Sequence, residues 1–212
     1  MLVARGNLDA TAAAVEATGR RATRVNADLA DRSAPDAIMT IAGDATILVN
    51  NAGIIRRANL LDYSDEDWDA VMDVNLRSVF MLSRAFARAL TARNTPGRII
   101  NIASMLSYQG GIRVVAYTAA KSAIVGLTRA LSNELAPRGI NVNAIAPGYM
   151  ATDNTQAIRD DETRNRDILA RIPAGRWGVP DDLKGAVVFL ASPASAYVHA
   201  TTLPVDGGWL SR

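Results

Sequence analysis

Short apolar runs alternate with amphipathic stretches of helix length along most of the chain. Several runs are apolar at consecutive positions, which is typical of strands buried on both faces of a parallel sheet. Six strands are predicted, over residues 1–5, 22–26, 46–50, 97–104, 140–147 and 201–206. Helices are predicted over residues 8–18, 34–42, 65–92, 115–136 and 180–192. This alternation, with short connections, predicts an α/β fold with a doubly wound parallel sheet.

Residues 149–179 break the alternation, because they are heavily charged and contain no strand pattern. We expect a helical insertion between the last two strands, at a place where a substrate lid can sit. No linker, repeat or low-complexity tract divides the chain. Residues 1–212 are therefore expected to form a single domain.

The composition narrows the function without naming it. A formal net charge of +2, with acidic and basic residues interspersed, indicates no nucleic-acid partner. The chain has no cysteine and one histidine, His199, so we expect no metal site and no thiol or Ser-His-Asp chemistry. No apolar run is long enough to cross a membrane, and the N-terminus lacks a signal-peptide core. A cytoplasmic protein without a membrane partner is expected.

The stretch VVAYTAAKSAIVGL, at 114–127, predicts an amphipathic helix with two polar groups on one flank. Tyr117 and Lys121 are four residues apart, so they lie on one helix face about one turn from each other. The plain interpretation is an aromatic ring packed on the sheet and a lysine that reaches solvent. Their surroundings in the sequence favour a functional interpretation.

Three predicted strands end in small or polar residues. Ser104 ends one strand, the segment NNAG at 50–53 ends a second, and Pro147–Gly148 ends a third. Ligands of open α/β sheets bind at the carboxyl ends of the strands. The strand ends and the Tyr117–Lys121 helix are therefore expected to share one cleft.

Together, Ser104, Tyr117, Lys121, NNAG and PG resemble the classical short-chain dehydrogenase/reductase family. The resemblance runs from residue 1 to residue 212. It implies a Rossmann-type fold of three α/β/α layers and a dehydrogenase that uses NAD or NADP. The stretches NIASMLSYQGGIRV, INVNAIAPGYMATDNTQ, RIPAGRWGVP and VDGGW are similar to the subgroup of 2-deoxy-D-gluconate 3-dehydrogenases and 2-dehydro-3-deoxy-D-gluconate 5-dehydrogenases.

The resemblance implies that Tyr117 moves a proton while hydride moves to or from carbon. Ser104 would bind the substrate oxygen, Lys121 would hold the ribose, and Asn75 would support a water relay. A phenol with a pKa of about 10 is a poor base, and lowering it by ~3 units requires about 4 kcal/mol. We expect the Lys121 ammonium and a cationic nicotinamide to stabilise the phenolate.

The resemblance also implies the cofactor contacts. These are expected from Arg5, Asp28, Leu29, Asn50, Ala52, Gly53, Tyr117, Lys121, Pro147, Gly148, Met150 and Thr152. A helix N-cap is the alternative role for Asp28. An arginine at position 5 favours the 2′-phosphate of NADP, whereas the subgroup favours NAD, so the choice between them stays open.

A sugar-acid substrate needs a partner for its carboxylate. We expect Arg113 to contribute to that site, with Gln109 and Asn154 reading hydroxyl groups beside Ser104 and Tyr117. Arg56 and Arg57 follow the NNAG segment and are expected to be solvated.

The opening strand and the Thr-Gly-x-x-x-Gly-x-Gly turn of the family have no match here. Three explanations stay open: an upstream start codon, leading residues that this sequence does not include, or a truncated paralogue. Without that strand, two strands face a gap of about 10 Å. They must close on each other, accept a foreign strand, or leave backbone groups unpaired.

Two alternative functions follow. One is a non-catalytic, oligomer-forming paralogue, and the other is a 3-oxoacyl or gluconate 5-dehydrogenase type of reductase. Helices 74–92 and 115–136 carry extra apolar and small residues, and such helices pack between subunits in the family, so a homotetramer is expected. The residues concerned are Val79, Phe80, Ala123, Leu127 and Leu131.

Overall fold

The computed structural model describes all 212 residues, and its apolar runs form six strands in two parallel sheets. The first sheet pairs β1 (Leu2–Ala4) with β2 (Arg24–Asn26). The second has the order β3 (Ile47–Asn50), β4 (Gly97–Ile102), β5 (Ile140–Pro147) and β6 (Thr202–Val205). Every strand lies inside its predicted range, and the α/β, Rossmann-type fold is confirmed.

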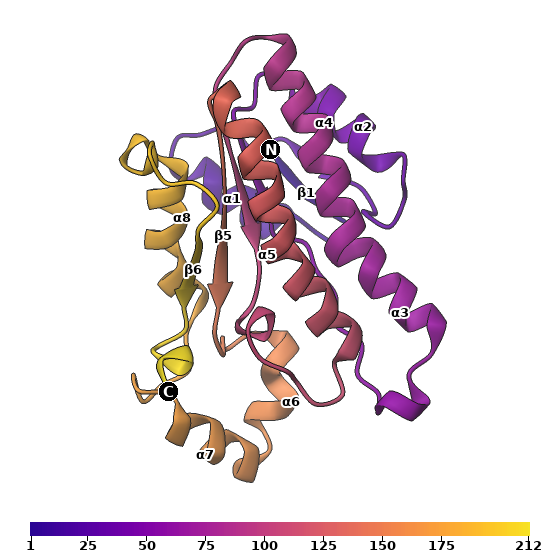
Figure 1. Cartoon of the computed structure of the whole chain (residues 1–212), viewed down its shortest axis with the longest axis vertical. Helices are drawn as coiled ribbons and strands as arrows, with labels where there is room; N and C mark the ends of the chain where they lie inside the picture. The colour runs from indigo at the N-terminus through magenta and orange to yellow at the C-terminus, as the bar shows by residue number, and fades with distance from the viewer.

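The central strand β5 separates two layers of helices, because successive side chains point to opposite faces. Ala144 and Ala146 pack with Ile124 on the face covered by α4 (Ser78–Ala92) and α5 (Val115–Leu135). Ile145 packs with Leu190 of α8 (Lys184–Ala191) on the other face. Figure 1 shows α5 lying along the sheet beside α4, with α8 at the other side. The three-layer arrangement therefore follows from small and large residues alternating along one strand.

The helix predicted over 65–92 is interrupted by one wider turn. It consists of α3 (Asp65–Met72), a π-helical turn (Asp73–Arg77) and α4. Ser64 caps α3, and its side chain accepts a hydrogen bond from the Asp67 N–H. Turns of π-helix inside α-helices often mark functional positions. This one carries Asn75, which is fully buried.

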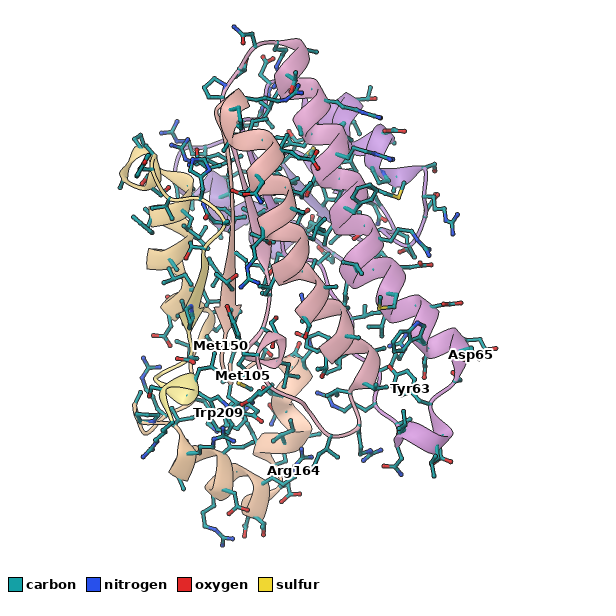
Figure 2. The ribbon with its side chains drawn as sticks, viewed as in Figure 1. Tyr63, Asp65, Met105, Met150, Arg164 and Trp209 are labelled. Carbon is teal, nitrogen blue, oxygen red and sulfur yellow. The ribbon has the colours of Figure 1, made fainter.

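The predicted insertion at 149–179 folds as two short helices, α6 (Gln156–Arg159) and α7 (Glu162–Arg171). A single β-bridge between Met150 and Gly178 closes the segment at its base. Ile168 of α7 packs with Met105 and Trp209 in one buried cluster. Figure 2 shows Met105, Met150 and Trp209 gathered near one another at the end of the molecule that α7 covers. The segment is thus anchored over the carboxyl ends of the strands.

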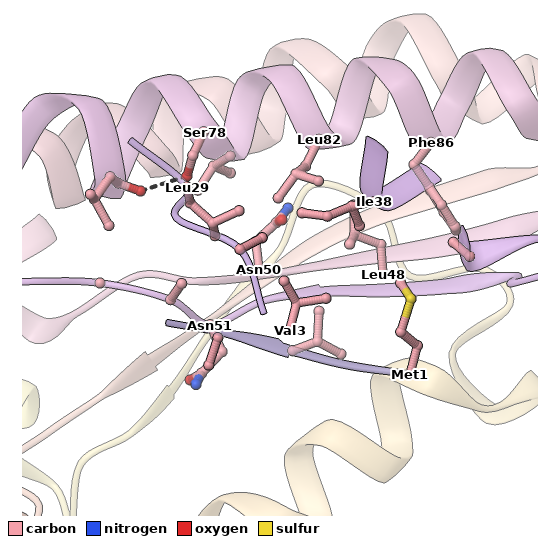
Figure 3. Close-up of a pocket in the computed structure, with 18 of the residues that line it drawn as sticks. Met1, Val3, Leu29, Ile38, Leu48, Asn50, Asn51, Ser78, Leu82 and Phe86 are labelled. Atoms are coloured by element: carbon pink, nitrogen blue, oxygen red, sulfur yellow. Dashed lines mark hydrogen bonds between the residues drawn. The ribbon is translucent and has the colours of Figure 1, made fainter. Parts of the chain in front are cut away.

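The two sheets are separated by a gap between β1 and β3, which do not pair with each other. A cavity of about 480 Å³ occupies this gap and is lined mainly by apolar side chains, Val3 and Leu48 among them (Figure 3). The edges of β1 and β3 do not close on each other within this chain. The first sheet is held instead by α2 (Ala34–Ala42), which packs on α4 through Ile38 and Leu82. The remaining N-terminal helix is α1 (Asp9–Glu16).

Most apolar residues that we expected at subunit contacts lie inside the chain. Val79 is buried, while Leu127 and Leu131 pack against core clusters, because α4 and α5 use these positions to cover the sheet. Phe80 differs, with 40% of its surface exposed. None of the helices has the length and apolar character that a membrane crossing would require.

Gly97 begins β4 at a point where a side chain has no room. A Cβ there would lie 2.3 Å from Leu90 Cδ1 and 2.9 Å from the Thr46 carbonyl oxygen. We predict that Gly97→Ala lowers the free energy of unfolding by about 1–3 kcal/mol, because the neighbouring backbone must move. Chemical denaturation measures the change. Gly185→Ala is the control, since a Cβ at that position meets no atom within 4 Å; equal stability of the two variants would contradict the prediction.

Candidate active site

Ser104 lies two residues beyond the end of β4, in extended backbone, and is 9% exposed. Its Oγ accepts a hydrogen bond from the Leu106 N–H at 3.2 Å and so starts a short 3-10 turn. In the same turn, Ser107 Oγ accepts from the Ser104 N–H at 3.3 Å and donates to the Lys121 carbonyl at 2.6 Å. These bonds fix the end of β4 against α5.

Lys121 is buried on α5 and is only 4% exposed. Its Nζ donates to the carbonyl oxygen of Ile102, the last residue of β4, at 2.6 Å. The same nitrogen lies 5.6 Å from the centre of the Tyr117 ring. Burial lowers the pKa of Lys121 from 10.5 to about 8, because a charged amine is poorly solvated there. The lysine therefore does not reach solvent, and the plain interpretation of the Tyr–Lys pair is wrong for it.

The Tyr117 hydroxyl has opposing influences on its pKa. Burial raises the pKa of Tyr117, while hydrogen bonding to the Ser104 side chain and the positive charge of Arg57 lower it. We expected Lys121 to supply the positive charge that acidifies this phenol. In the structure the charge of Arg57 contributes to lowering this pKa, while the Lys121 amine donates to the Ile102 carbonyl and is itself destabilised by burial. The role of the Lys121 charge stays a prediction.

Asn75 holds the segment that follows β3. Its Nδ2 donates to the Ile54 carbonyl and its Oδ1 accepts from the Ile54 N–H, both at 2.8 Å. A Cβ on Gly53 would lie 3.3 Å from Asn75 Oδ1 and 3.9 Å from Lys121 Nζ, so the segment passes close to the buried lysine. We expected Asn75 to support a water relay. Its observed hydrogen bonds instead hold both the N–H and the carbonyl of Ile54. Asn75 makes them from the π-helical turn.

The cavity between the sheets extends to the predicted cofactor residues at the strand ends. Its lining includes Arg5, Asp28, Leu29, Asn50, Ala52 and Gly53. Arg5 and Asp28 form an exposed ion pair at 3.4 Å. Asp28 Oδ1 also accepts from the Ala30 N–H at 2.9 Å. The alternative role of Asp28 as a helix cap is wrong, because α2 begins six residues later, after Ser33.

Asn50 is buried at the wall of this cavity. Its Nδ2 donates to Ser83 Oγ at 3.0 Å and to Asn101 Oδ1 at 2.8 Å, and Asn101 continues the network to Thr128 at 3.0 Å. Asn50 Oδ1 has no hydrogen-bond donor within the chain. A buried acceptor without a donor is costly unless a ligand supplies one. The hydroxyl groups of a dinucleotide are suitable donors, so this wall fits NAD(P).

The predicted nicotinamide segment leads from β5 into the insertion. Gly148 directly follows β5 and has no room for a side chain. A Cβ there would lie 2.6 Å from the Cα of Asp206, the residue after β6. Pro147 ends β5, and Met150 lies against Gly178 in the bridge. The Thr152 N–H donates to Thr155 Oγ1 at 3.2 Å. None of these four residues lines the cavity between the two sheets. Met150 lines a separate, smaller pocket with Tyr149 and Gly178.

The predicted substrate residues differ in their surroundings. Gln109 Oε1 accepts from Trp209 Nε1 at 3.1 Å and from an Arg171 nitrogen at 3.4 Å, so that oxygen is already bonded. Arg113 is exposed, has a φ of 64° and makes no side-chain hydrogen bond or ion pair. The Asn154 carbonyl accepts from Arg57 at 3.0 Å.

Arg56 and Arg57 were expected to be solvated, and both are exposed. Two adjacent arginines are indistinguishable in the sequence. The structure separates them by their partners, because Arg56 pairs with Asp67 at 3.1 Å whereas Arg57 donates to the Asn154 carbonyl at 3.0 Å.

Comparison with known proteins agrees with this arrangement. A family model described as enoyl-(acyl carrier protein) reductase matches residues 2–210. The 2-dehydro-3-deoxy-D-gluconate 5-dehydrogenase of Dickeya dadantii is 56% identical over 93% of this chain and 80% of its own length. The Bacillus subtilis protein of the same name is 53% identical over 97% of this chain and 82% of its own length.

A crystal structure of a proposed 2-deoxy-D-gluconate 3-dehydrogenase from Agrobacterium tumefaciens, with bound NADP, superimposes with a TM-score of 0.94. It is 52% identical, and the match covers 99% of this chain and 85% of that one. The resemblance noted in the sequence is thus confirmed by the family match, by the relatives and by the fold. The chain belongs to the short-chain dehydrogenase/reductase family of NAD(P)-dependent oxidoreductases.

Proposed function

We propose that the protein interconverts a secondary alcohol and a ketone on a sugar acid, of the 2-dehydro-3-deoxy-D-gluconate or 2-deoxy-D-gluconate type. The observation that carries the proposal is the buried Lys121 amine 5.6 Å from the centre of the Tyr117 ring, with the Ser104 side chain acting to lower the pKa of the Tyr117 hydroxyl. The sugar-acid class is supported by the names of relatives that are more than 50% identical.

In the proposed reaction, Tyr117 exchanges a proton with the substrate oxygen and Ser104 binds that oxygen. Bound NAD(P) supplies or accepts the hydride at the substrate carbon. Since burial raises the pKa of Tyr117, the phenol is protonated near neutral pH and is ready to donate to a ketone oxygen. In the oxidative direction the phenol must lose its proton, which nearby positive charge favours. Arg57 already provides charge of the right sign.

Lys121 is proposed to position the ribose of the cofactor. An ammonium group carries more N–H donors than the one that the Ile102 carbonyl accepts. The donors left over can bind ribose hydroxyls close to Gly53, where the backbone comes near Nζ. Asn75 is proposed as a positioning residue, because it holds the Ile54 peptide that follows this glycine.

For the rest of the cofactor, we propose that Asp28, Leu29, Asn50 and Ala52 line its site, and that Pro147, Gly148, Met150 and Thr152 border the nicotinamide. We also propose NADP as the better ligand. Arg5 supports this choice, because its ion pair with Asp28 is exposed on both sides and is therefore weak. A 2′-phosphate would pair with the same guanidinium in a charge-assisted contact. The bound NADP in the Agrobacterium structure is further support.

We further propose a single domain, a cytoplasmic location and a homotetramer, with residues 149–179 as the substrate lid. Phe80 supports the assembly, since it is a large apolar side chain exposed on α4. The lid is supported by its anchorage over the strand ends through Ile168 and Met105.

The first test of the function is Tyr117→Phe. We predict a fall in turnover of a sugar acid with NADP(H) of about a hundredfold or more, because a positioned acid–base group contributes at least that much. NADP(H) affinity, measured by quenching of tryptophan fluorescence, should change little. Tyr197→Phe is the control, since Tyr197 is 99% exposed. Turnover of Tyr117→Phe at the level of Tyr197→Phe would remove Tyr117 from the reaction.

The second prediction concerns Lys121→Met and pH. The pKa of Lys121 is about 8 in the folded protein, and its ordinary value, taken for the unfolded chain, is 10.5. The unfolded chain therefore binds the lysine proton more strongly than the folded protein does. The free energy of unfolding should therefore rise with pH between about 8 and 10.5, by roughly 3 kcal/mol relative to Lys121→Met. Denaturation across this pH range measures the difference. Parallel curves for the two proteins would contradict the buried, destabilised amine.

The third prediction is that Arg5→Ala weakens NADP(H) binding about tenfold and leaves NAD(H) binding nearly unchanged, because a phosphate contact is lost. Arg24→Ala is the control, because it removes the same charge elsewhere. Arg24 lies on β2 and pairs with Asp9 and Glu16 of α1. Equal loss for both cofactors would refute the phosphate contact. If the unaltered protein binds neither cofactor, the non-catalytic alternative replaces the proposed function.

A further inference from the structure

The loop that precedes α8 is closed by one acidic side chain, Asp182. It belongs to a short 3-10 turn, Pro180–Leu183, and its Oδ2 accepts a hydrogen bond from the Val179 N–H at 2.8 Å. Its two carboxylate oxygens also accept from the two terminal nitrogens of Arg176, at 2.7 and 2.8 Å. Asp182 therefore draws residues 176–182 into one loop with Gly178 inside it.

The contact between Arg176 and Asp182 has a fixed geometry. Two parallel hydrogen bonds from a planar guanidinium set both the distance and the orientation of the carboxylate. Many exposed ion pairs contribute little, and Arg176 is 59% exposed, but a bidentate pair with good geometry is the exception. The hydrogen bonds from Arg176 and from the Val179 N–H hold the pKa of Asp182 well below its ordinary value. The pair therefore stays charged, and the loop keeps its shape, near neutral pH.

Gly178 joins this loop to the segment that leaves β5. Its N–H donates to the Tyr149 carbonyl at 2.9 Å, and its carbonyl accepts from the Ala151 N–H at 2.8 Å. A side chain at position 178 would collide with Met150 Sδ, so the two backbones are in close contact. Residues 149–151 therefore take their backbone partners from the loop that Asp182 closes, and Thr152 is the next residue along the chain.

Aromatic packing ties the same loop to the insertion. Trp177 lies edge-on to Tyr149, with ring centres 5.3 Å apart. The Trp177 indole N–H donates to Asn165 Oδ1 of α7 at 2.7 Å. Arg176 and Asp182 line the small pocket that contains Met150, and neither lines the cavity between the two sheets. The loop therefore supports one end of the predicted cofactor site and has no part in the wall of the other.

We propose that the Arg176–Asp182 pair positions the nicotinamide end of the cofactor. By holding Gly178, the pair fixes the backbone of residues 149–151 and so the place of Thr152. The inference rests on the proposed function, because it assigns the support of the nicotinamide segment in that same site. Both residues act through Gly178, so they are positioning residues. Loss of the pair disturbs hydride transfer and leaves the adenosine end of the cofactor site, between the two sheets, intact.

The test uses Asp182→Asn, which keeps the size of the side chain and an acceptor for Val179 but removes the charge. The turnover number kcat with NADPH and a keto sugar acid should fall about tenfold to a hundredfold, the cost of a misplaced reacting group. KM for the sugar acid should stay within about twofold. The Kd of 2′-phospho-ADP-ribose, which lacks only the nicotinamide ring of NADP, should also stay within about twofold by calorimetric titration.

A kinetic isotope effect separates misplacement from a general loss of structure. Product release limits kcat in many enzymes, so slower hydride transfer should raise the isotope effect on kcat with NADPH deuterated at the transferred hydrogen. A smaller fraction of folded enzyme would lower kcat without changing that effect. Arg176→Lys keeps the charge, loses the second parallel hydrogen bond and should lie between Asp182→Asn and the unaltered protein.

Asp181→Asn is the matched control, because Asp181 is the neighbouring residue and pairs with Lys184 on an exposed surface. It should match the unaltered protein. An unchanged kcat in Asp182→Asn would overturn the inference, as would a lower kcat with an unchanged isotope effect or an equally weakened 2′-phospho-ADP-ribose. If Asp182→Asn does not fold, Arg176→Lys decides by the same readouts. Failure of the unaltered protein to turn over any sugar acid would refute the proposed function itself, whereas a failure confined to these variants refutes this inference alone.

Discussion

The buried Lys121 amine and its hydrogen bond to the Ile102 carbonyl are the constraint on which the site depends. A charged amine away from water is costly, so the fold must give it an acceptor. The acceptor is the last carbonyl of β4, and this fixes the height of α5 against the sheet. Tyr117, one turn earlier on the same helix, is thereby placed next to Ser104, just beyond that strand. The position of the Tyr117 hydroxyl thus follows from where the Lys121 amine finds its acceptor.

Buried asparagine side chains fix the strand ends and helices on the β3 side of the site. Asn50 and Asn101 join neighbouring strands β3 and β4 and link them to Ser83 on α4 and Thr128 on α5. Asn75 fixes the peptide that leaves β3. Polar groups buried with their partners specify one arrangement of the elements around them, because a shifted arrangement would leave them unpaired. The ligand cleft is therefore bordered by hydrogen bonds that the protein cannot lose cheaply.

The sequence was sufficient for the strands and for the Tyr117–Lys121 helix, because burial on both faces and helical spacing leave periodic patterns. It was insufficient where a long-range contact decides the outcome. The π-helical turn around Asn75 depends on the distant Ile54 peptide, and nothing in the local pattern of 65–92 marks it. Likewise, only the three-dimensional partners distinguish Arg57 from Arg56. Arg113 is exposed on the loop before α5, and its role at the substrate carboxylate stays a prediction.

The packing of α2 has a consequence for the predicted cofactor site. Val3 of β1 and Val25 of β2 pack with Ile38 of α2 and Leu82 of α4. Arg5 and Asp28 follow these two strands and line the same cavity as Asn50 and Gly53. The side chain at position 38 therefore helps to set how far the Arg5–Asp28 pair lies from the end of β3, although it is remote from every group expected to react.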